Sequence, residues 1–172
     1  MKKYILWILA GLLITVLGVS GCKKEVETAS ADTDAVSSAS VVSTAEGFIN
    51  AAGENGTWII AITEDLSIDE EIVLAGQFTR RDQIARKIAL YSQDEDRNIT
   101  ARYTLSAPRL TVRSENTRIQ GGTFKGDVHV EANGFHIVDA TVDGDIVFAS
   151  QEYRSSFSLQ DGAEVTGEQT VE

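Results

Sequence analysis

The feature that most constrains this chain is a repeat of about 18 residues in its second half. Three short apolar segments follow one another at that step without gaps: Leu110-Thr-Val112, Val128-His-Val130 and Ile146-Val-Phe148. Within each segment apolar and polar residues alternate, which is the period of a β-strand. A unit this short, bounded by Gly, Asp and Asn, cannot bury its apolar face alone and must stack on copies of itself.

Other positions keep the same step. Ile119 aligns with Ile137, Thr123 with Thr141, and Phe124 with Val142; the segment 165–171 is a degenerate further copy. Going backwards, the pattern predicts that Ile88-Ala-Leu90 and Ile72-Val-Leu74 continue the column of Leu110, at steps of 22 and 16 residues. The sequence therefore predicts an all-β fold, a right-handed single-stranded parallel β-helix (solenoid) of about five to six coils over residues 43–172.

A short helix is expected before the first coil, which begins with Trp58, Ile60 and Ile62. Ser43-Thr44 followed by AEGFINAAG has the pattern of a capped helix of about two turns, with Phe48, Ile49 and Ala52 as its apolar stripe. We expect it to cover the open end of the β-helix, because bare strand edges promote aggregation.

The coil length and the Gly-Asp turns at 126–127 and 144–145 resemble those of right-handed parallel β-helix proteins, including the pectin-lyase-like and bactofilin-like families. The resemblance covers residues 57–172. It implies a fold far more than an activity, because a fold hosts many unrelated functions.

The N-terminus has the order of a bacterial export signal. Lys2 and Lys3 precede an apolar run from Tyr4 to Val19, and Val19-Ser20-Gly21-Cys22 follows. This resembles the lipobox of bacterial lipoproteins, which implies cleavage after residue 21 and a lipid on Cys22. Residues 1–21 are then the signal peptide and 22–42 the lipidated cysteine and a flexible tether. The expected location is the cell envelope: the outer membrane in a Gram-negative cell, the cell surface in a Gram-positive one.

The charge of the chain limits its partners. The formal net charge is −11, and without Lys2 and Lys3 the 26 acidic residues face 13 basic ones. This argues against nucleic acid, whose phosphates require a basic surface. The segment 79–118 is the exception, because it is rich in Lys and Arg, and Arg80-Arg81-Asp82 lies in an interruption between Leu74 and Ile88.

One outward face is the candidate ligand site. If Leu110 and Val112 point inward, the residues between them point outward, and stacking places Tyr91, Arg109, Arg113 and His129 on one surface. The same columns predict cross-strand ion pairs, namely Glu71–Lys87, Arg109–Asp127 and Arg113–Glu131. The face therefore has two interpretations, a charge ladder that stabilises the register or a glycan-binding patch in which Arg holds carboxylates.

The sequence assigns no catalytic residue and no cofactor. Asp127 and Asp145 form a stacked carboxylate pair that could share Ca²⁺, but calcium usually takes six to eight oxygen ligands; the alternative is that each Gly-Asp simply forms a turn. His129 and His136 are expected on different sheets, too far apart to share a metal.

The expected function is a non-enzymatic binding or scaffold module on an envelope lipoprotein, with a glycan or an envelope protein as its partner. The alternative is a self-associating module like the bactofilins, stacking through its last coil. A polysaccharide lyase or hydrolase is a distant third, because hydrolases need convergent carboxylates at a set separation.

Overall fold

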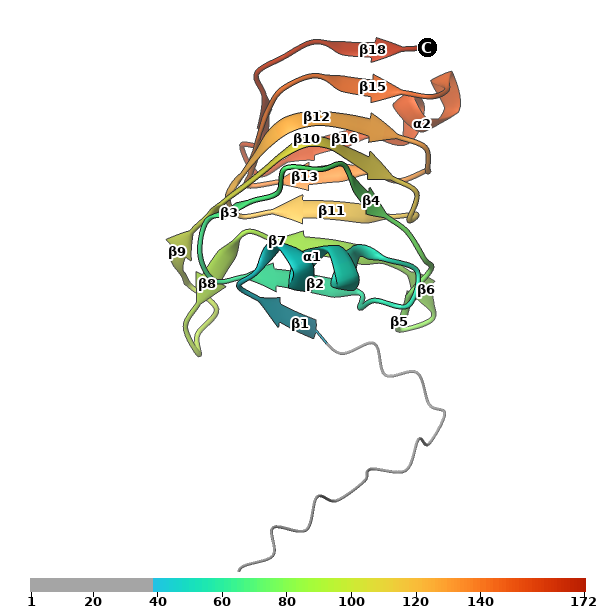
Figure 1. Cartoon of the computed structure of the whole chain (residues 1–172). Helices are drawn as coiled ribbons and strands as arrows, with labels where there is room; N and C mark the ends of the chain where they lie inside the picture. The colour runs from blue at the N-terminus through green and yellow to red at the C-terminus, as the bar shows by residue number, and fades with distance from the viewer. Residues whose placement is uncertain (1–38) are drawn as a thin grey trace, which may run out of the picture. The chain divides into compact units, whose positions relative to one another are not determined.

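The computed structural model describes residues 39–172. They form a mostly β molecule with two parallel sheets of six and eight strands (Figure 1). Sheet A contains, in order, β1 (Ala39–Val42), β2 (Ile59–Ile62), β7 (Arg86–Ala89), β11 (Thr117–Gln120), β13 (His136–Val138) and β16 (Ser158–Gln160). Sheet B contains β3 (Leu66–Ser67), β4 (Ile72–Leu74), β10 (Thr104–Val112), β12 (Thr123–Val130), β14 (Thr141–Asp143), β15 (Ile146–Phe148), β17 (Glu164–Val165) and β18 (Gln169–Val171).

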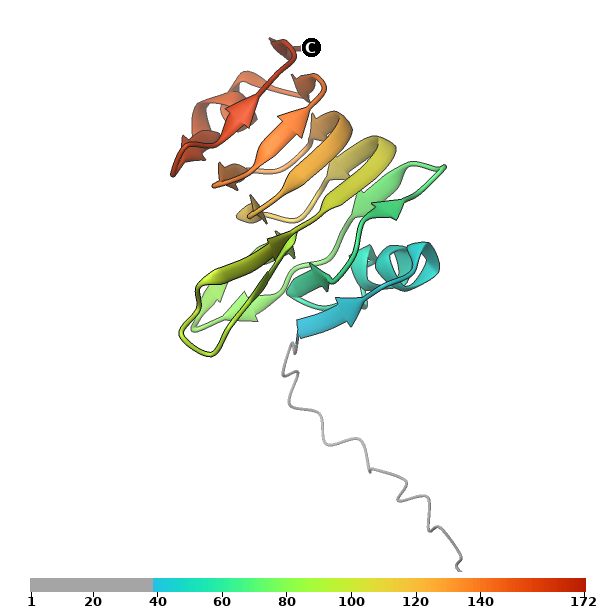
Figure 2. The same cartoon turned by 90° about the vertical axis from the view of Figure 1, so that its left-hand side faces the viewer.

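The chain passes alternately between the two sheets, and the repeat step becomes the strand register. Leu110 is in register with Val128, and Val128 with Ile146, in sheet B. In sheet A, Ile119 is in register with Ile137. The prediction of parallel stacking at this step is confirmed, and the arrangement is consistent with a parallel β-helix (Figure 2).

The core lies between the sheets and is formed by the inward positions of the alternating strands. These apolar side chains make one cluster, in which Phe124, Val128 and Ile137 have no exposed surface. An inward Leu or Ile contributes about 1.5–3 kcal/mol by burial. The alternation of the sequence is therefore an alternation between this core and solvent.

Helix α1 (Ala45–Ala52) is present as predicted, with Thr44 as its N-cap. The Thr44 hydroxyl accepts a hydrogen bond from the Gly47 amide at 3.1 Å, which satisfies one of the free amides of the first turn. Phe48 and Ala52 are buried against the core, while Ile49 is partly buried.

The expected tether ends too late. Its last four residues form β1, which is in parallel register with β2 from Ala39–Ile59 to Val42–Ile62. Val41 and Val42 are β-branched, and the edge of sheet A offers their backbone groups partners. Composition alone predicts a flexible segment up to residue 42, but composition does not show that a sheet edge is available to residues 39–42.

The column drawn through Ile88 and Leu90 is also wrong. Leu110 is directly in register with Ile72, whereas Ile88 belongs to sheet A, where it faces Ile60 and Ile119. Two antiparallel hairpins lengthen the chain on either side of β7: β5–β6 (Thr79–Arg80 and Gln83–Ile84) and β8–β9 (Tyr91–Gln93 and Ile99–Arg102). Because these hairpins add residues between Ile72 and Leu110, the repeat length in this part of the chain cannot be recognised from the sequence.

The turns Gly126-Asp127 and Gly144-Asp145 stack on one another in sheet B, and we call this stack the corner column. Neighbouring turns in it are in close contact and are joined by hydrogen bonds. A Cβ on Gly144 would lie 2.2 Å from the Gly126 carbonyl oxygen, so only glycine fits there. Beside it, Asp127 Oδ1 accepts the Asp145 amide at 3.1 Å, and Asp145 Oδ1 accepts the Glu168 amide at 2.8 Å. The Gly-Asp pairs therefore form turns, and each Asp side chain joins its turn to the next one.

A second helix, α2 (Gln151–Ser156), fills the longer excursion before the last strands. Sequence reasoning did not find it, because it lasts only one and a half turns. Ser150 is its N-cap, and Phe157 after it stacks on Phe135 with ring centroids 5.6 Å apart.

The signal segment, Cys22 and the tether up to residue 38 lie outside the described residues. Within residues 39–172, neither helix is long and apolar enough to cross a membrane.

Candidate functional site

The predicted ligand face is assembled only in part. Arg109 lies on β10 and Arg113 directly follows that strand, while His129 lies on the neighbouring β12, where it is in register with Thr111. Tyr91 does not join them. It starts β8, which follows β7 of sheet A, so its inclusion rested on the mistaken column through Leu90.

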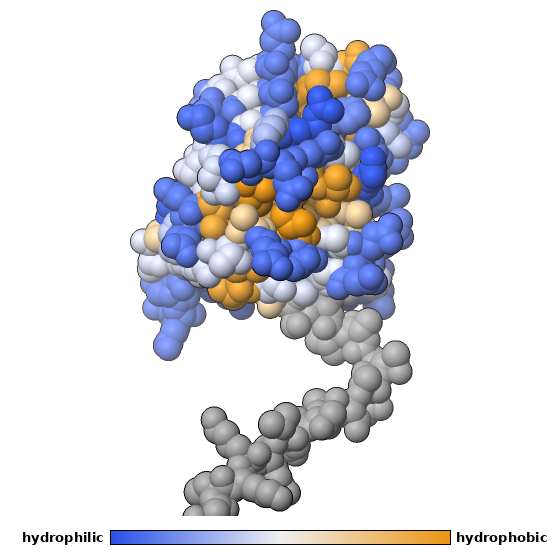
Figure 3. All heavy atoms as spheres, in the orientation of Figure 1, coloured by the Kyte–Doolittle hydropathy of each residue, from blue (hydrophilic) through white to orange (hydrophobic). Residues whose placement is uncertain are grey.

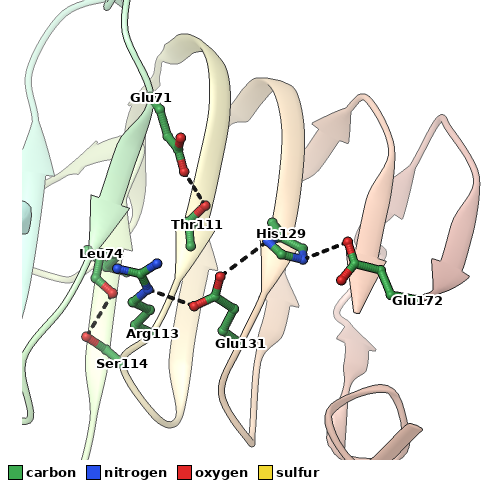
Figure 4. A network of polar contacts seen from close by, with 8 residues as sticks. All are labelled: Glu71, Leu74, Thr111, Arg113, Ser114, His129, Glu131 and Glu172. Carbon is green, nitrogen blue, oxygen red and sulfur yellow. Dashed lines mark hydrogen bonds and ion pairs between the residues drawn. The ribbon is translucent and has the colours of Figure 1, made fainter. Parts of the chain in front are cut away.

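The charges on this face are engaged with one another, and we call Arg113, His129 and Glu131 the paired face (Figure 4). Arg113 Nε donates to Glu131 Oε2 at 2.7 Å, as predicted. His129 lies between two carboxylates, with Nδ1 3.4 Å from Glu131 and Nε2 3.4 Å from Glu172, both at ion-pair rather than hydrogen-bond geometry.

The rest of the predicted ladder differs from expectation. Glu71 does not meet Lys87, which is on the other sheet; it accepts a hydrogen bond from the Thr111 hydroxyl at 2.5 Å. Arg109 is in register with Asp127, but no ion pair joins them among the described residues. The Asp127 carboxylate binds a backbone amide instead.

The pKa of Glu131 is consistent with a face whose charged groups are paired with one another. The hydrogen bond from Arg113 holds the pKa of Glu131 below its ordinary value, and the charges of Arg113 and His129 act in the same direction. A ligand carboxylate would have to compete with Glu131 for Arg113. The paired face is therefore better explained as a stabilising ladder than as a binding patch.

The carboxylates of Asp127 and Asp145 each use one oxygen for a backbone amide of the next turn. Within residues 39–172, no three His, Cys, Asp or Glu side chains are grouped so that they could hold a metal ion. His129 and His136 lie on different sheets, as expected.

A different surface has the geometry of a binding site. The outer face of sheet A carries two neighbouring cavities of about 680 and 660 Å³, which share Trp58, Arg80, Lys87 and Arg118 among their lining residues. Hairpins β5–β6 and β8–β9 contribute to the lining from either end of β7. Figure 2 shows the β8–β9 hairpin projecting on the side of the molecule opposite α1. We call this continuous depression the basic groove.

The basic groove concentrates positive charge on an acidic chain. No carboxylate of residues 39–172 lies in an ion pair with any of its basic side chains. Asp82 is the one acidic residue in the lining of the two cavities. The basic residues there are Arg80, Arg81, Arg86, Lys87, Arg97 and Arg118.

Aromatic rings position two of these cations. The Arg80 guanidinium lies 4.8 Å from the centre of the Trp58 ring, and Lys87 Nζ donates to the Tyr91 hydroxyl at 2.8 Å. Tyr91 in turn packs against Gly121, where a Cβ would lie 2.1 Å from the ring. Tyr91 is therefore held in the groove by its packing on Gly121 as well as by its place in the β8–β9 hairpin.

Two hairpin tips hold arginine in the left-handed backbone region. Arg81 and Asp82 have φ of 49° and 63° in the two-residue turn of β5–β6, where Asn-Gly is usual, and Arg97 has φ of 69° in the β8–β9 turn. A non-glycine residue in this region costs about 1–2 kcal/mol. Such strain is typical of functional segments, and both arginines line the groove.

Beneath the groove, Arg86 anchors the strand that carries Lys87. Its side chain is 1% exposed, and Nη2 donates to the carbonyls of Ala51 and Ala52 at 2.6 and 2.9 Å, at the C-terminus of α1. Its guanidinium lies 4.0 Å from the Phe78 ring centre. Burial lowers the pKa of Arg86 to about 10. Arg86 therefore has a structural role, connecting β7 to helix α1.

The face of the molecule seen in Figure 3 differs in character from the groove. Hydrophobic residues gather across the middle of this face and in a smaller group near its top, with hydrophilic residues between and around them. Large apolar side chains that are clearly exposed are few among the described residues: Val41, Leu159 and Val171.

Sequence reasoning found part of the basic groove. It singled out the basic segment 79–118 and the Arg80-Arg81-Asp82 interruption, but it did not connect them with Trp58 or His136. These residues are distant in sequence, and only the pairing of β2, β7, β11 and β13 places them on one surface.

No family model, no curated protein and no solved structure matches this chain.

Proposed function

We propose that this protein is an envelope-anchored lipoprotein whose folded part is a non-enzymatic module that binds an anionic glycan in the basic groove. The two parallel sheets would be the walls of a single right-handed β-helix of about five to six coils, resembling the pectin-lyase-like and bactofilin-like proteins. The lipid on Cys22 would attach the module to the membrane outside the cytoplasm.

One observation carries the proposal: basic side chains without carboxylate partners line one groove of a chain with a net charge of −11. Outside the groove, three of the five basic side chains of residues 39–172 are paired with carboxylates, including Arg113–Glu131 at 2.7 Å and Arg102–Asp139 at 2.8 Å, whereas Arg109 and Arg154 are not. Leaving like charges close together costs stability, so an unneutralised groove favours a function that uses the charge.

The chemistry of the lining favours an acidic sugar polymer. Guanidinium groups bind carboxylates through paired hydrogen bonds, and Trp58 and Tyr91 add aromatic surface to the same groove. Two neighbouring cavities that share four lining residues offer successive positions to the units of a polymer. Its basic side chains lie on hairpin tips and strands, so the site is pre-formed.

The test is affinity electrophoresis of the full chain in mild detergent through gels that contain polygalacturonate or neutral dextran. We expect retardation by polygalacturonate alone. The double variant Lys87→Gln with Arg118→Gln should lose it. The matched control, Arg109→Gln with Arg113→Gln, removes the same charge from the face of β10 and should keep it.

The outcomes separate the candidate faces. Loss of retardation only in the control would place the ligand on β10 and contradict the groove. Retardation by neither polymer would reject acidic glycan binding. Equal retardation by both polymers would show that charge is not what the protein recognises.

A second function, self-association through the last strands, is favoured by one observation. Leu159 on β16 and Val171 on β18 are 42% and 39% exposed at the final edges of the two sheets. Pairing of such edges between copies is the usual hazard of open sheets. Sedimentation equilibrium tests it: mass should rise with concentration, and Val171→Asp should abolish the rise. A concentration-independent mass would exclude it.

A further inference from the structure

The strongest unexplained feature of the basic groove is a row of three basic side chains on neighbouring strands. Lys87 on β7 is in register with Arg118 on β11, and Arg118 is in register with His136 on β13. Neighbouring strands lie about 4.8 Å apart, so these side chains are adjacent. The equivalent positions of the paired face carry opposite charges. A carboxylate is missing from this row among the described residues.

His136 is the member of the row whose charge can change near neutral pH. Burial, and secondly the charge of Arg118, hold its pKa below the ordinary value. The ring is therefore neutral at pH 7. Protonation in the empty groove would place a third positive charge beside Arg118, which is unfavourable.

Asp82, in the turn between β5 and β6, is the one carboxylate that lines the same cavity as His136, but Arg118 is the charge that shifts the pKa of His136. Its partner on β16 is Ser158, which is uncharged. The one acidic residue of α2 is Glu152, which accepts a hydrogen bond from Asn133 Nδ2 at 2.8 Å. Arg118 is thus the charged group that faces the ring, together with Lys87 one strand further along. The ring and both cations line the same cavity of about 680 Å³.

We propose that Arg118 and His136 form a carboxylate subsite at this end of the basic groove, and that an acidic sugar bound there takes up a proton on His136. This proposal rests on the proposed function. It adds which part of the groove binds a carboxylate of the glycan, and that binding is tightest when His136 is protonated. The Arg118 guanidinium holds the carboxylate, and the protonated imidazole donates to it. Lys87, held by the Tyr91 hydroxyl at 2.8 Å, faces the next carboxylate of the polymer.

Proton uptake on binding makes affinity depend on pH. If the bound carboxylate stabilises the imidazolium by one pKa unit, affinity for polygalacturonate rises about tenfold as the pH falls through the titration of His136. Carboxylates of the polymer stay ionised above about pH 5, so the rise does not come from the ligand.

The experiment measures affinity of the full chain for polygalacturonate at pH 8.0 and pH 5.5, at constant ionic strength. The readout is the ratio of the two affinities. We expect a severalfold ratio for the natural sequence, with about ten as its upper bound because the lowered pKa of His136 leaves part of the change below pH 5.5, and a ratio near one for His136→Asn. The matched control His129→Asn, on the paired face, should keep the full ratio.

A second measurement needs no variant. The NMR titration of the His136 ring in the natural protein should move to higher pH when polygalacturonate is added, whereas that of His129 should stay in place. An unchanged His136 titration, or an equal affinity ratio in His136→Asn and the natural protein, overturns the proton-linked subsite while the groove stands. Failure to bind at either pH rejects the proposed function itself.

Discussion

Gly144→Ala tests the packing of the corner column directly. The added methyl would lie 2.2 Å from the Gly126 carbonyl oxygen and 2.6 Å from its carbon. An ordinary carbon–oxygen contact is about 3.3 Å or more, so the two turns must separate by about 1 Å. Gly144 has an ordinary φ, and the effect therefore comes from stacking and not from backbone strain.

The magnitude follows from what that separation breaks. The Val128 amide donates to the Asp145 carbonyl at 2.8 Å, and the Asp145 amide donates to Asp127 Oδ1 at 3.1 Å, both across the two turns that must separate. Losing both costs about 1–3 kcal/mol, and overpacking adds about 1–3 kcal/mol. Alanine returns about 0.4–1 kcal/mol by restricting the unfolded chain. We expect a net loss of about 3 kcal/mol in the free energy of unfolding.

Gly162→Ala is the matched control. Gly162 has a φ of 76°, but no atom lies within 4 Å of the position of the new methyl. Only the left-handed conformation is penalised, by about 1–2 kcal/mol before the same unfolded-state correction.

Urea unfolding followed by far-ultraviolet circular dichroism gives both values. With a slope of about 2 kcal/mol per molar urea, the midpoint of Gly144→Ala should fall by about 1.5 M, and that of Gly162→Ala by about 0.5 M. If Gly144→Ala costs no more than Gly162→Ala, the carbonyl contact does not limit how closely the turns stack, and the explanation of the Gly-Asp repeat is wrong.

Two further predictions concern the arginines. Arg86→Ala should lower the free energy of unfolding by about 3 kcal/mol, because it empties a buried volume and leaves the α1 carbonyls without a donor; a loss under 1 kcal/mol in urea unfolding would contradict the anchoring role. Arg113→Ala should cost much less than Arg86→Ala at pH 7, because its ion pair with Glu131 is exposed to solvent. Since the folded-state pKa of Glu131 is lowered, this contribution is present above the ordinary glutamate pKa of about 4.3 and is lost as the pH falls through the folded-state value. Equal destabilisation at pH 7 and in acid would show that Arg113 acts by packing instead.

The repeat made much of the fold predictable. Ile119, Ile137 and the columns of Leu110 and Phe124 could be placed because apolar alternation at a constant step determines both sheet and register. Prediction failed between β4 and β10, where two hairpins change the length of the unit. Nothing in the apolar pattern distinguishes a hairpin strand from a strand of the main sheets, so Leu90 and Tyr91 were placed in the wrong column.

The candidate site was less accessible to sequence reasoning. A cross-strand ion pair such as Arg113–Glu131 could be predicted from the step alone. The basic groove depends on the absence of such partners around Lys87 and Arg118, and an absence is visible only when every neighbour is known. The sequence indicated where positive charge accumulates but not that it remains unneutralised.

The strands that carry Lys87, Arg118 and His136 are neighbours in sheet A, so each repeat adds one strand spacing to the length of this sheet. Duplication of one 18-residue unit would add a strand to each sheet, lengthening the outer face of sheet A by about 4.8 Å. The corner column shows where a duplicated unit would fit, because each Gly-Asp turn connects only to the turns before and after it. The length of the outer face of sheet A would therefore change in evolution by whole units, without redesign of the core.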